Sequence, residues 1–308
     1  MVTRARTGIR QSTADRVFDV FNKTLMVIFL LTMIYPLWFV LIASVSNVNK
    51  VNVGTVILLP QGFNLDSYRY VIQEDTIWRG YRNTIIVTIL GVVWHLCLLM
   101  PTGYAISKKY LLGRTVIQWF FLFTMFFSGG LIPSYLLFKS MGLCNTLTIL
   151  WIGCLGVGDM VVVRTYFQSS IPDDLYESAD IDGATDFQKF FKIALPLAKP
   201  IIAVETLYIA VWKWNDFYTA LIYITKGNYF PLQLVLRNVL LLNQSMLSNL
   251  NKGSNMSEEM IRELTYRAKV AEAMKYSIIY IASAPMLIAY PFVQKYFVKG
   301  IMVGALKG

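Results

Sequence analysis

Charged residues are scarce in this chain of 308 residues: they make up 15% of it, against about 25% in typical globular proteins. Apolar residues make up 56%, and the mean hydropathy is +0.53. The charges that are present lie between long uncharged stretches and do not mark every helical turn. A single soluble core cannot absorb so much apolar surface. These shortages therefore exclude an ordinary soluble domain and indicate that lipid is the solvent.

Recognisable sequence motifs for catalysis or metal binding are also missing. The three cysteines, Cys97, Cys144 and Cys154, form no pair with metal-ligand spacing. The chain has no His-Glu-x-x-His pattern and no glycine-rich loop that ends in Lys-Ser or Lys-Thr. His95, the single histidine, is predicted to be a buried, hydrogen-bonded structural residue. We therefore predict no catalytic residue, no metal site and no cofactor in this chain.

The net charge of +10 does not indicate a nucleic-acid partner, because the basic residues flank apolar segments instead of forming one basic face. That placement is typical of the cytoplasmic flanks of membrane spans. The segment 1–23 holds five basic residues, Arg4, Arg6, Arg10, Arg16 and Lys23. The apolar run Thr24–Val45 that follows is longer than a signal-peptide core of roughly 7–15 residues. No small-residue cleavage site follows it. The sequence predicts a retained first span with a cytoplasmic N-terminus.

Six segments have the roughly 20 apolar residues that a helix needs to cross a bilayer. They are Thr24–Val45, Thr84–Ile106, Thr115–Phe138, Thr146–Phe167, Ile201–Ile224 and Tyr276–Phe297. The predicted fold class is an all-α membrane protein with six transmembrane helices, kinked at the interior prolines Pro36, Pro101, Pro133, Pro285 and Pro291.

The spans divide the chain into a cytoplasmic N-terminal segment 1–23, a transmembrane domain 24–298 and a cytoplasmic C-terminal tail 299–308. Both termini are predicted to lie inside, with outer loops at 46–83 and 225–275. The stretch from Ser257 to Lys275 has helical spacing and is predicted to be a helix that leads into the last span.

The cytoplasmic connection 171–199 reads as helix, turn, helix. Pro172 suits a first helical position, and Gly183 can adopt positive φ and end that helix. Thr185 with Gln188 predicts a capping box for the second helix.

Apolar residues of this second helix are predicted to share one side, and prolines are predicted to end it before the fifth span. The apolar residues are Phe187, Phe190, Phe191 and Ala194, and the prolines are Pro196 and Pro200. Two interpretations stand: the short helix that ends on glycine fits a groove in a partner, or the segment is an amphipathic helix lying in the membrane interface.

Glu177-Ser-Ala-Asp-Ile-Asp-Gly183 followed by Ile193-Ala-Leu-Pro196 resembles the EAA motif of permease subunits in ABC importers. Ser178 departs from the usual alanine. By this resemblance the residues that couple the permease to its ATPase are Glu177, Ala179, Asp182, Gly183, Ile193, Leu195 and Pro196. Two further stretches, Trp212–Phe217 and Tyr296–Gly308, resemble the carbohydrate-uptake permeases of the maltose-permease type. A third, Phe127–Ser134, resembles the oligosaccharide branch of that family.

The resemblance implies a division of labour in binding-protein-dependent sugar transport. This chain pairs with a second homologous permease, two ATP-binding subunits supply ATP and Mg²⁺ chemistry, and an extracellular solute-binding protein delivers the sugar. The chain lies in the bacterial inner membrane, and the loop 171–199 contains a coupling helix. The C-terminal tail, with Gly300, Gly304 and Gly308, extends to the ATPase.

The fifth span carries candidates for the translocation path, since sugar rings stack on aromatic side chains and sugar hydroxyls need hydrogen-bond partners. Tyr208, Trp212, Asn215 and Thr219 are predicted to project to one side, and Asp216 to pair with Lys213 three residues away. Packing of these aromatics against neighbouring helices is the alternative interpretation.

A secondary transporter driven by protons or sodium is the rival function, because Asp159 and Glu205 fall inside predicted spans. That mechanism does not require a capped helix-Gly-helix in one cytoplasmic loop. The two halves of the chain also show no evident repeat, so the sequence favours the ABC permease.

Overall fold

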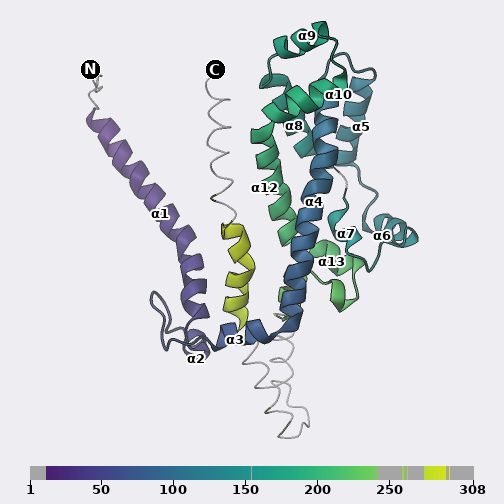
Figure 1. Ribbon diagram of the computed structural model, residues 1–308. Coiled ribbons are helices and arrows are strands. Elements are labelled where there is room, and N and C mark those ends of the chain that lie inside the picture. Colours follow the sequence, from purple (N-terminus) through teal and green to yellow (C-terminus); the bar gives the residue numbers. More distant parts are fainter. Residues whose placement is uncertain are drawn as a thin grey trace. The chain divides into compact units, whose positions relative to one another are not determined.

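The computed structural model describes residues 12–153, 155–239 and 274–288, together with residues 241, 259, 262 and 291. Regular structure in these residues is entirely helical, which agrees with the expected all-α class (Figure 1). The chain forms two compact units, residues 1–71 with 255–280 and residues 72–254 with 281–308.

The first unit begins with the long helix α1, Thr13–Ser44. Ser12 caps it: the Ser12 hydroxyl accepts from the Asp15 amide at 3.1 Å, and the Asp15 carboxylate accepts from the Ser12 amide at 2.9 Å. The helix therefore starts well before the predicted Thr24. Pro36 lies inside it, and most of its apolar side chains are exposed, as a surface that faces lipid would be.

The connection after α1 is structured. It holds α2, Val48–Asn52, and α3, Asp66–Gln73. Tyr68 of α3 shares a hydrogen bond of 2.8 Å with the hydroxyl of Ser44 at the end of α1.

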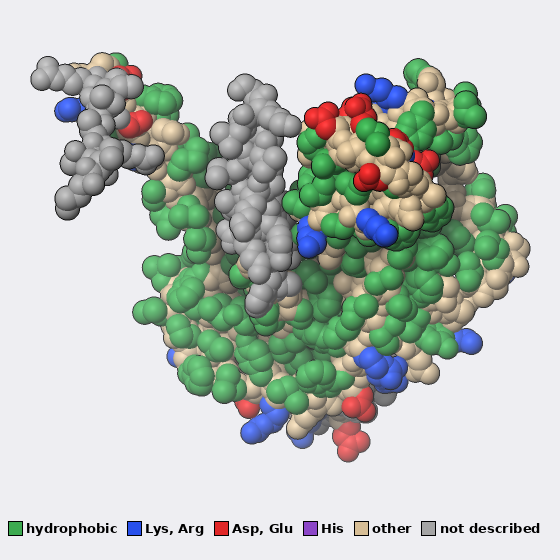
Figure 2. Space-filling model, turned by 45° about the horizontal axis from the view of Figure 1, so that its top comes forward, with side chains coloured by type: hydrophobic (Ala, Val, Ile, Leu, Met, Phe, Trp, Pro, Cys, Tyr) green, Lys and Arg blue, Asp and Glu red, His purple; other side chains and the backbone are tan. Residues whose placement is uncertain are grey.

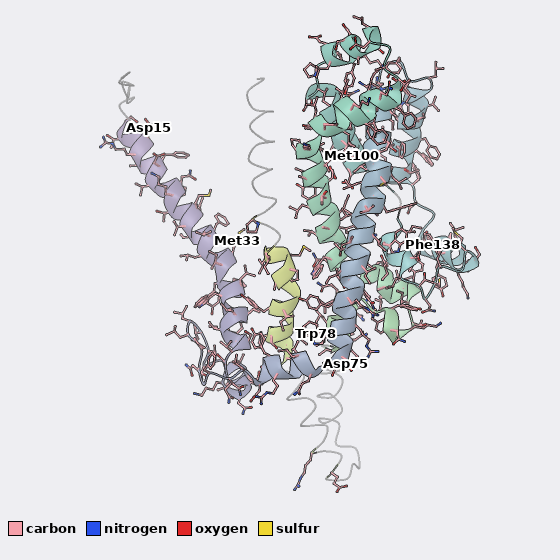
Figure 3. All side chains as sticks on the ribbon, viewed as in Figure 1. Asp15, Met33, Asp75, Trp78, Met100 and Phe138 are labelled. Carbon is pink, nitrogen blue, oxygen red and sulfur yellow. The ribbon has the colours of Figure 1, made fainter. Side chains whose placement is uncertain are left out.

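The second unit is built along α4, Asp75–Ser107 (Figure 3). At 1.5 Å per residue this helix is roughly 50 Å long, more than a bilayer core of about 30 Å requires. It begins at Asp75, ahead of the predicted Thr84. The helices α8, Val157–Ser169, and α12, Lys199–Asn215, pack along it.

Several predicted spans are broken. α5, Arg114–Phe126, and α6, Leu131–Ser140, meet at 111° across Phe127–Gly130. A short helix α7, Thr148–Trp151, precedes α8, and α13, Tyr218–Tyr223, follows α12.

Of the prolines expected to mark kinks, Pro36 and Pro101 lie inside continuous helices, whereas Pro133 is the third residue of α6, directly after the break between α5 and α6. In the described part of the chain, α1 and α4 are each long and apolar enough to cross a membrane. The count rises to four if each sharply bent helix pair is one span.

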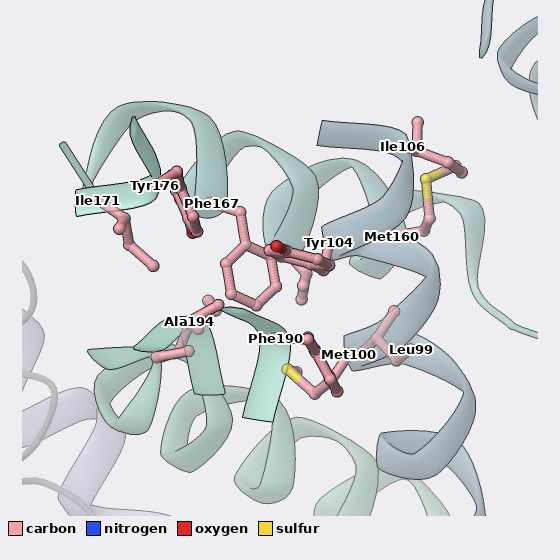
Figure 4. Packing of buried hydrophobic residues seen from close by; sticks show 13 residues of the cluster. Leu99, Met100, Tyr104, Ile106, Met160, Phe167, Ile171, Tyr176, Phe190 and Ala194 are labelled. Atoms are coloured by element: carbon pink, nitrogen blue, oxygen red, sulfur yellow. The ribbon is translucent and has the colours of Figure 1, made fainter. Parts of the chain in front are cut away.

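Polar and apolar side chains separate on the surface of the second unit. Acidic and basic side chains gather over the end that holds α9, Asp174–Ile181, and the surface beneath is mainly hydrophobic (Figure 2). Inside that end, side chains from α4, α8 and the α9 region form one apolar cluster (Figure 4).

Close packing of α4 on α8 depends on Gly103. A Cβ at this position would lie 2.6 Å from Cγ1 of Val163, whereas a Cβ on Gly158 of α8 would meet nothing within 4 Å. We expect Gly103→Ala to lower the free energy of unfolding by about 1–3 kcal/mol, because one of the two helices must shift. Gly158→Ala, which adds the same methyl group to a helix, is the control and should be neutral. Thermal unfolding of the purified complex checks this, and equal melting temperatures for the two variants would contradict the packing argument.

Candidate functional site

The loop that carries the EAA-like residues forms α9 and a tight glycine turn. α9 begins at Asp174, so Pro172 lies just before the helix and not at its first position. Gly183 has φ of +72°, which a glycine adopts without strain. The Ala184 amide donates to the Ala179 carbonyl at 2.9 Å and the Gly183 amide to the Asp180 carbonyl at 3.0 Å, the bonding pattern of a Schellman cap. The predicted glycine stop is therefore confirmed.

The side chains of α9 divide into two sets. Tyr176 and Ala179 are buried against the rest of the unit. Glu177 and Asp182 are exposed. The helix thus offers carboxylates to the exterior while its other face is held by the fold.

The second part of the loop begins with the predicted capping box. Thr185 and Gln188 exchange hydrogen bonds of 2.9 and 3.4 Å at the start of α10, Asp186–Gln188. A π-helical stretch, Lys189–Ala194, follows directly.

The prediction that the four apolar residues of this segment share one side is wrong. Phe190 and Ala194 are buried, whereas Phe187 is 76% exposed and stacks on the exposed Phe191. The wider π turn changes the angular spacing of side chains, so residues that would share a face in an α-helix are separated.

The expected stop before the fifth span is present. The π-helical stretch continues into α11, Leu195–Leu197, and this continuous helix ends at Leu197, one residue after Pro196. Pro200 is the second residue of α12, a first-turn position where the missing amide of proline costs nothing. The chain bends by 76° between α11 and α12. Ile193 and Leu195 are half-buried there and Pro196 is exposed.

An aromatic cluster joins this loop to the end of α4. The ring of Tyr104 lies 5.1 Å from Phe190 and 6.1 Å from Tyr176, centroid to centroid (Figure 4). Nζ of Lys108 lies 2.9 Å from the centroid of the Tyr176 ring, a cation–π contact. Burial lowers the pKa of Lys108 to about 8.

Charged groups hold the two parts of the loop together. Lys189 forms ion pairs with Asp180 of α9 and, at 3.1 Å, with Asp186 of α10. The Tyr110 hydroxyl donates to Asp186 at 2.7 Å. The hydrogen bond to Asp180 raises the pKa of Lys189, and the hydrogen bond from Tyr110 lowers the pKa of Asp186. Burial raises the pKa of Tyr110 to about 12.

Three of the candidate path residues share a cavity. Tyr208, Trp212 and Asn215 of α12 line an open cavity of about 610 Å³, together with Gln233 and Trp214. The Asn215 amide donates to the Val211 carbonyl at 2.8 Å and accepts from Gln233 at 3.5 Å. The mixture of rings and amides suits a ligand with both apolar faces and hydroxyls.

The other two candidates lie beyond the end of α12. Asp216 accepts from the Thr219 amide at 3.0 Å and so supports the first turn of α13. Thr219 lines a separate cavity of about 320 Å³ with Ser128 and Ser134. The single helical face expected from Tyr208 to Thr219 is interrupted because α12 ends at Asn215.

Lys213 has a different partner from the predicted one. Its Nζ donates to the Leu150 carbonyl at 2.8 Å, where α7 ends, and no ion pair with Asp216 occurs among the described residues. The Trp94 indole donates to the Gly153 carbonyl at 3.3 Å in the same break. Sequence reasoning missed this break, although Gly153 and Gly156 were available as its signal.

His95 is buried, and its Nδ1 shares a hydrogen bond of 2.8 Å with the Gly91 carbonyl, as predicted. Among the residues that the structure places, no group of three or more His, Cys, Asp or Glu could hold a metal. The tail glycines Gly300, Gly304 and Gly308 and nearly all of 257–273 lie outside the described residues.

Comparison with known families decides what kind of protein carries this site. The family described as "Binding-protein-dependent transport system inner membrane component" matches residues 7–303. The chain belongs to this family.

Its relatives are permeases of sugar importers. The chain is 34% identical, over 96% of its length and 99% of the relative, to the "Polygalacturonan/rhamnogalacturonan transport system permease protein YtcP" of Bacillus subtilis. It is 26% identical, over 89% of its length and 91% of the relative, to the "Arabinooligosaccharides transport system permease protein AraQ" of Halalkalibacterium halodurans.

The fold has a solved counterpart. A chain of a bacterial ABC transporter "involved in the import of the acidic polysaccharide alginate" is similar with a TM-score of 0.81 and 33% identity, covering 94% of this chain and 99% of that one. This protein is therefore the permease subunit of an ABC importer and not an enzyme, and nothing in these relationships favours an ion-coupled carrier.

Proposed function

We propose that this permease forms, with a second homologous permease, the pathway by which an oligosaccharide crosses the bacterial inner membrane. Two ATP-binding subunits drive the pair with ATP and Mg²⁺, and an extracellular binding protein delivers the sugar. The observation that carries the proposal is the exposed, glycine-capped helix α9, which occupies the position of the EAA-like residues in a chain that matches its family from residue 7 to 303.

The sugar we propose is a fragment of an acidic polysaccharide. Two well-matched relatives, each at least 33% identical, are named for polygalacturonan and for alginate. Both polymers are built from uronic acids. Maltodextrin is named for a relative that is only 25% identical, so neutral glucans fit less well.

Within the subunit, we assign the path to the cavity of Tyr208, Trp212 and Asn215. Trp212 is 54% exposed and its ring is available to a sugar, whereas Trp214 is buried and donates to the Ala282 carbonyl at 3.0 Å. Packing against neighbouring helices, the alternative interpretation for the aromatic residues of this span, therefore applies to Trp214. Asp216 and Thr219 support the end of this path through the first turn of α13.

The proposed topology keeps six spans with both termini cytoplasmic, within a transmembrane permease domain 24–298. α1 and α4 are the first two spans. The bent pair α5 and α6 forms the third, the broken pair α7 and α8 the fourth, and α12 with α13 the fifth. The segment that includes the helix 274–288 is the sixth.

In this arrangement α9 is the coupling helix in the cytoplasmic loop 171–199, and the tail 299–308 also reaches the ATPase. Glu177 and Asp182 are exposed and can meet basic groups of a partner. Ala179 faces inward and holds α9 against the permease.

Reporter fusions test the topology. Fusions at the N-terminus and at Lys307 should both report the cytoplasm, and a fusion at Ser248, in the outer loop 225–275, should report the opposite side. A result that places Ser248 and Lys307 on the same side would contradict six spans.

Uptake by the assembled transporter tests the path and the sugar together. With labelled oligogalacturonides as substrate, Trp212→Ala should lower the transport rate about five- to tenfold, as the loss of one stacking contact predicts. Trp119→Ala on α5, which removes an equally large ring that is 68% exposed outside the cavity, is the matched control and should behave as wild type. Equal rates for both variants would remove Trp212 from the path. Wild-type uptake of maltodextrins in preference to oligogalacturonides would refute the acidic substrate.

Gly183 allows α9 docking to be tested apart from backbone strain. A Cβ on Gly183 meets nothing within 4 Å in this chain, so a larger residue there causes no clash within the permease. The strain of placing it in the left-handed conformation is about 1–2 kcal/mol. If the ATPase association weakens by more than this, the added side chain clashes with an external partner. Gly183→Trp should reduce copurification of the ATPase at least tenfold, and Gly183→Asn, which tolerates the left-handed conformation, should reduce it little. Gly142→Trp is the control, because Gly142 has φ of +69° and equally open surroundings. If all three complexes copurify like wild type, α9 is not the docking element.

A further inference from the structure

We propose that Lys189 is a positioning residue for energy coupling, which locks α9, α10 and the connection between α4 and α5 into one rigid block. The inference rests on the proposed role of α9 in the ATP-driven cycle. It adds a second route for the motion of α9, through α4 as well as through the direct chain path into α12.

The contacts of Lys189 join three elements. Its ammonium pairs with Asp180 on α9 and, at 3.1 Å, with Asp186 on α10. Asp186 uses the same oxygen to accept from the Tyr110 hydroxyl at 2.7 Å, and Tyr110 lies in the connection that follows α4. One cation therefore ties together groups that lie up to 76 positions apart in the sequence.

The burial of Lys189 distinguishes this network from an ordinary surface ion pair. Its side chain is only 7% exposed, whereas the carboxylates of Asp180 and Asp186 are 58% and 59% exposed. Its enclosed side chain holds the ammonium beside the two carboxylates, and removal of the lysine leaves both of them without their shared cation. The two carboxylates raise its pKa, so the charge persists throughout the physiological range.

The π-helical stretch explains how a lysine reaches this position. Lys189 and Phe190 are consecutive residues and both are buried, as is Ala194. The wider turn allows both side chains to face the interior, and such turns occur frequently at functional sites. Phe190 then contacts the ring of Tyr104 on α4 at 5.1 Å, so an apolar contact reinforces the ionic one.

The packing of α4 determines which helices a displacement of α9 would reach. α4 packs along both α8 and α12. A displacement of α9 would reach α12 from its chain end through α11, and it would also reach the middle of the helix bundle through α4. Packed elements of this kind shift between discrete arrangements and do not deform smoothly.

The test uses the complete transporter in lipid vesicles and measures solute imported per ATP hydrolysed. Lys189→Met should lower this ratio about fivefold, in line with the loss of ion pairs whose carboxylates are exposed to solvent, while ATPase copurification persists. Lys192→Met removes the same charge from an exposed position of the same π-helical stretch, and this control should keep the wild-type ratio. A Lys189→Met transporter with the wild-type ratio would overturn the proposal.

Tyr110→Phe decides the case in which Lys189→Met fails to assemble, because it removes only the hydroxyl that bonds Asp186. It should lower the same ratio about two- to fivefold, and a wild-type ratio would overturn the proposal. Where Lys189→Met assembles, the double variant should be no worse than the more severe single one, since both act on one network. ATP-independent uptake by the wild-type complex would instead defeat the proposed function, which keeps the two failures distinct.

Discussion

The absence of water in the bilayer core is the constraint on which the rest of this structure depends. In lipid each backbone amide and carbonyl must find its partner inside the protein, so a spanning segment can break only where side chains replace the lost bonds. At the break between α7 and α8, Lys213 and Trp94 donate to the Leu150 and Gly153 carbonyls. At the end of α12, Asp216 accepts from the Thr219 amide. The polar residues within these apolar segments thus stabilise interrupted helices.

The long helix α4 is the element against which these interrupted segments pack. Three glycines along it, at intervals of 11 and 12 residues, each admit a different neighbour. A Cβ would lie 3.1 Å from the Leu232 backbone at Gly80, 3.1 Å from the Lys213 side chain at Gly91 and 2.6 Å from Val163 at Gly103. A Cβ at Gly103 would force α4 and α8 to shift, and at Gly80 and Gly91 the neighbouring atoms would have to move by a few tenths of an ångström, so glycine favours close approach along the helix.

The sequence predicted correctly those features that depend only on interactions between neighbouring residues. The Thr185 capping box and the Gly183 stop each depend on a few neighbouring residues, and both formed as expected. The family resemblance was also readable, because the EAA-like residues all fall within the single stretch Glu177–Pro196.

The features that were missed depend on distant partners or on irregular helices. Lys213 bonds Leu150, 63 positions away, and the short spacing to Asp216 gave no hint of it. Similarly, the separation of the four apolar residues after Asp186 results from a π turn, which helical periodicity assumes to be absent. Thr219 does not share a helical face with Tyr208, because α12 ends at Asn215. Hydropathy alone does not predict that helix end.

Helix α12 connects the loop proposed to contact the ATPase with the proposed sugar path. Its first turn follows the 76° bend after α11, and its last residue, Asn215, lines the cavity of Tyr208 and Trp212. With 17 residues it is roughly 26 Å long, and Glu205, Ile209 and Lys213 on its buried face hold it within the bundle. A displacement at the α11 end therefore cannot be absorbed by sliding alone, because the Lys213 ammonium must retain a partner in a region without water. Rotation about that anchored point, or a joint shift with α7, is the motion that keeps the Lys213 ammonium bonded to the Leu150 carbonyl. Either motion would change the cavity wall, which gives a physical reason for an ABC permease to carry a lysine beside a tryptophan of its proposed path.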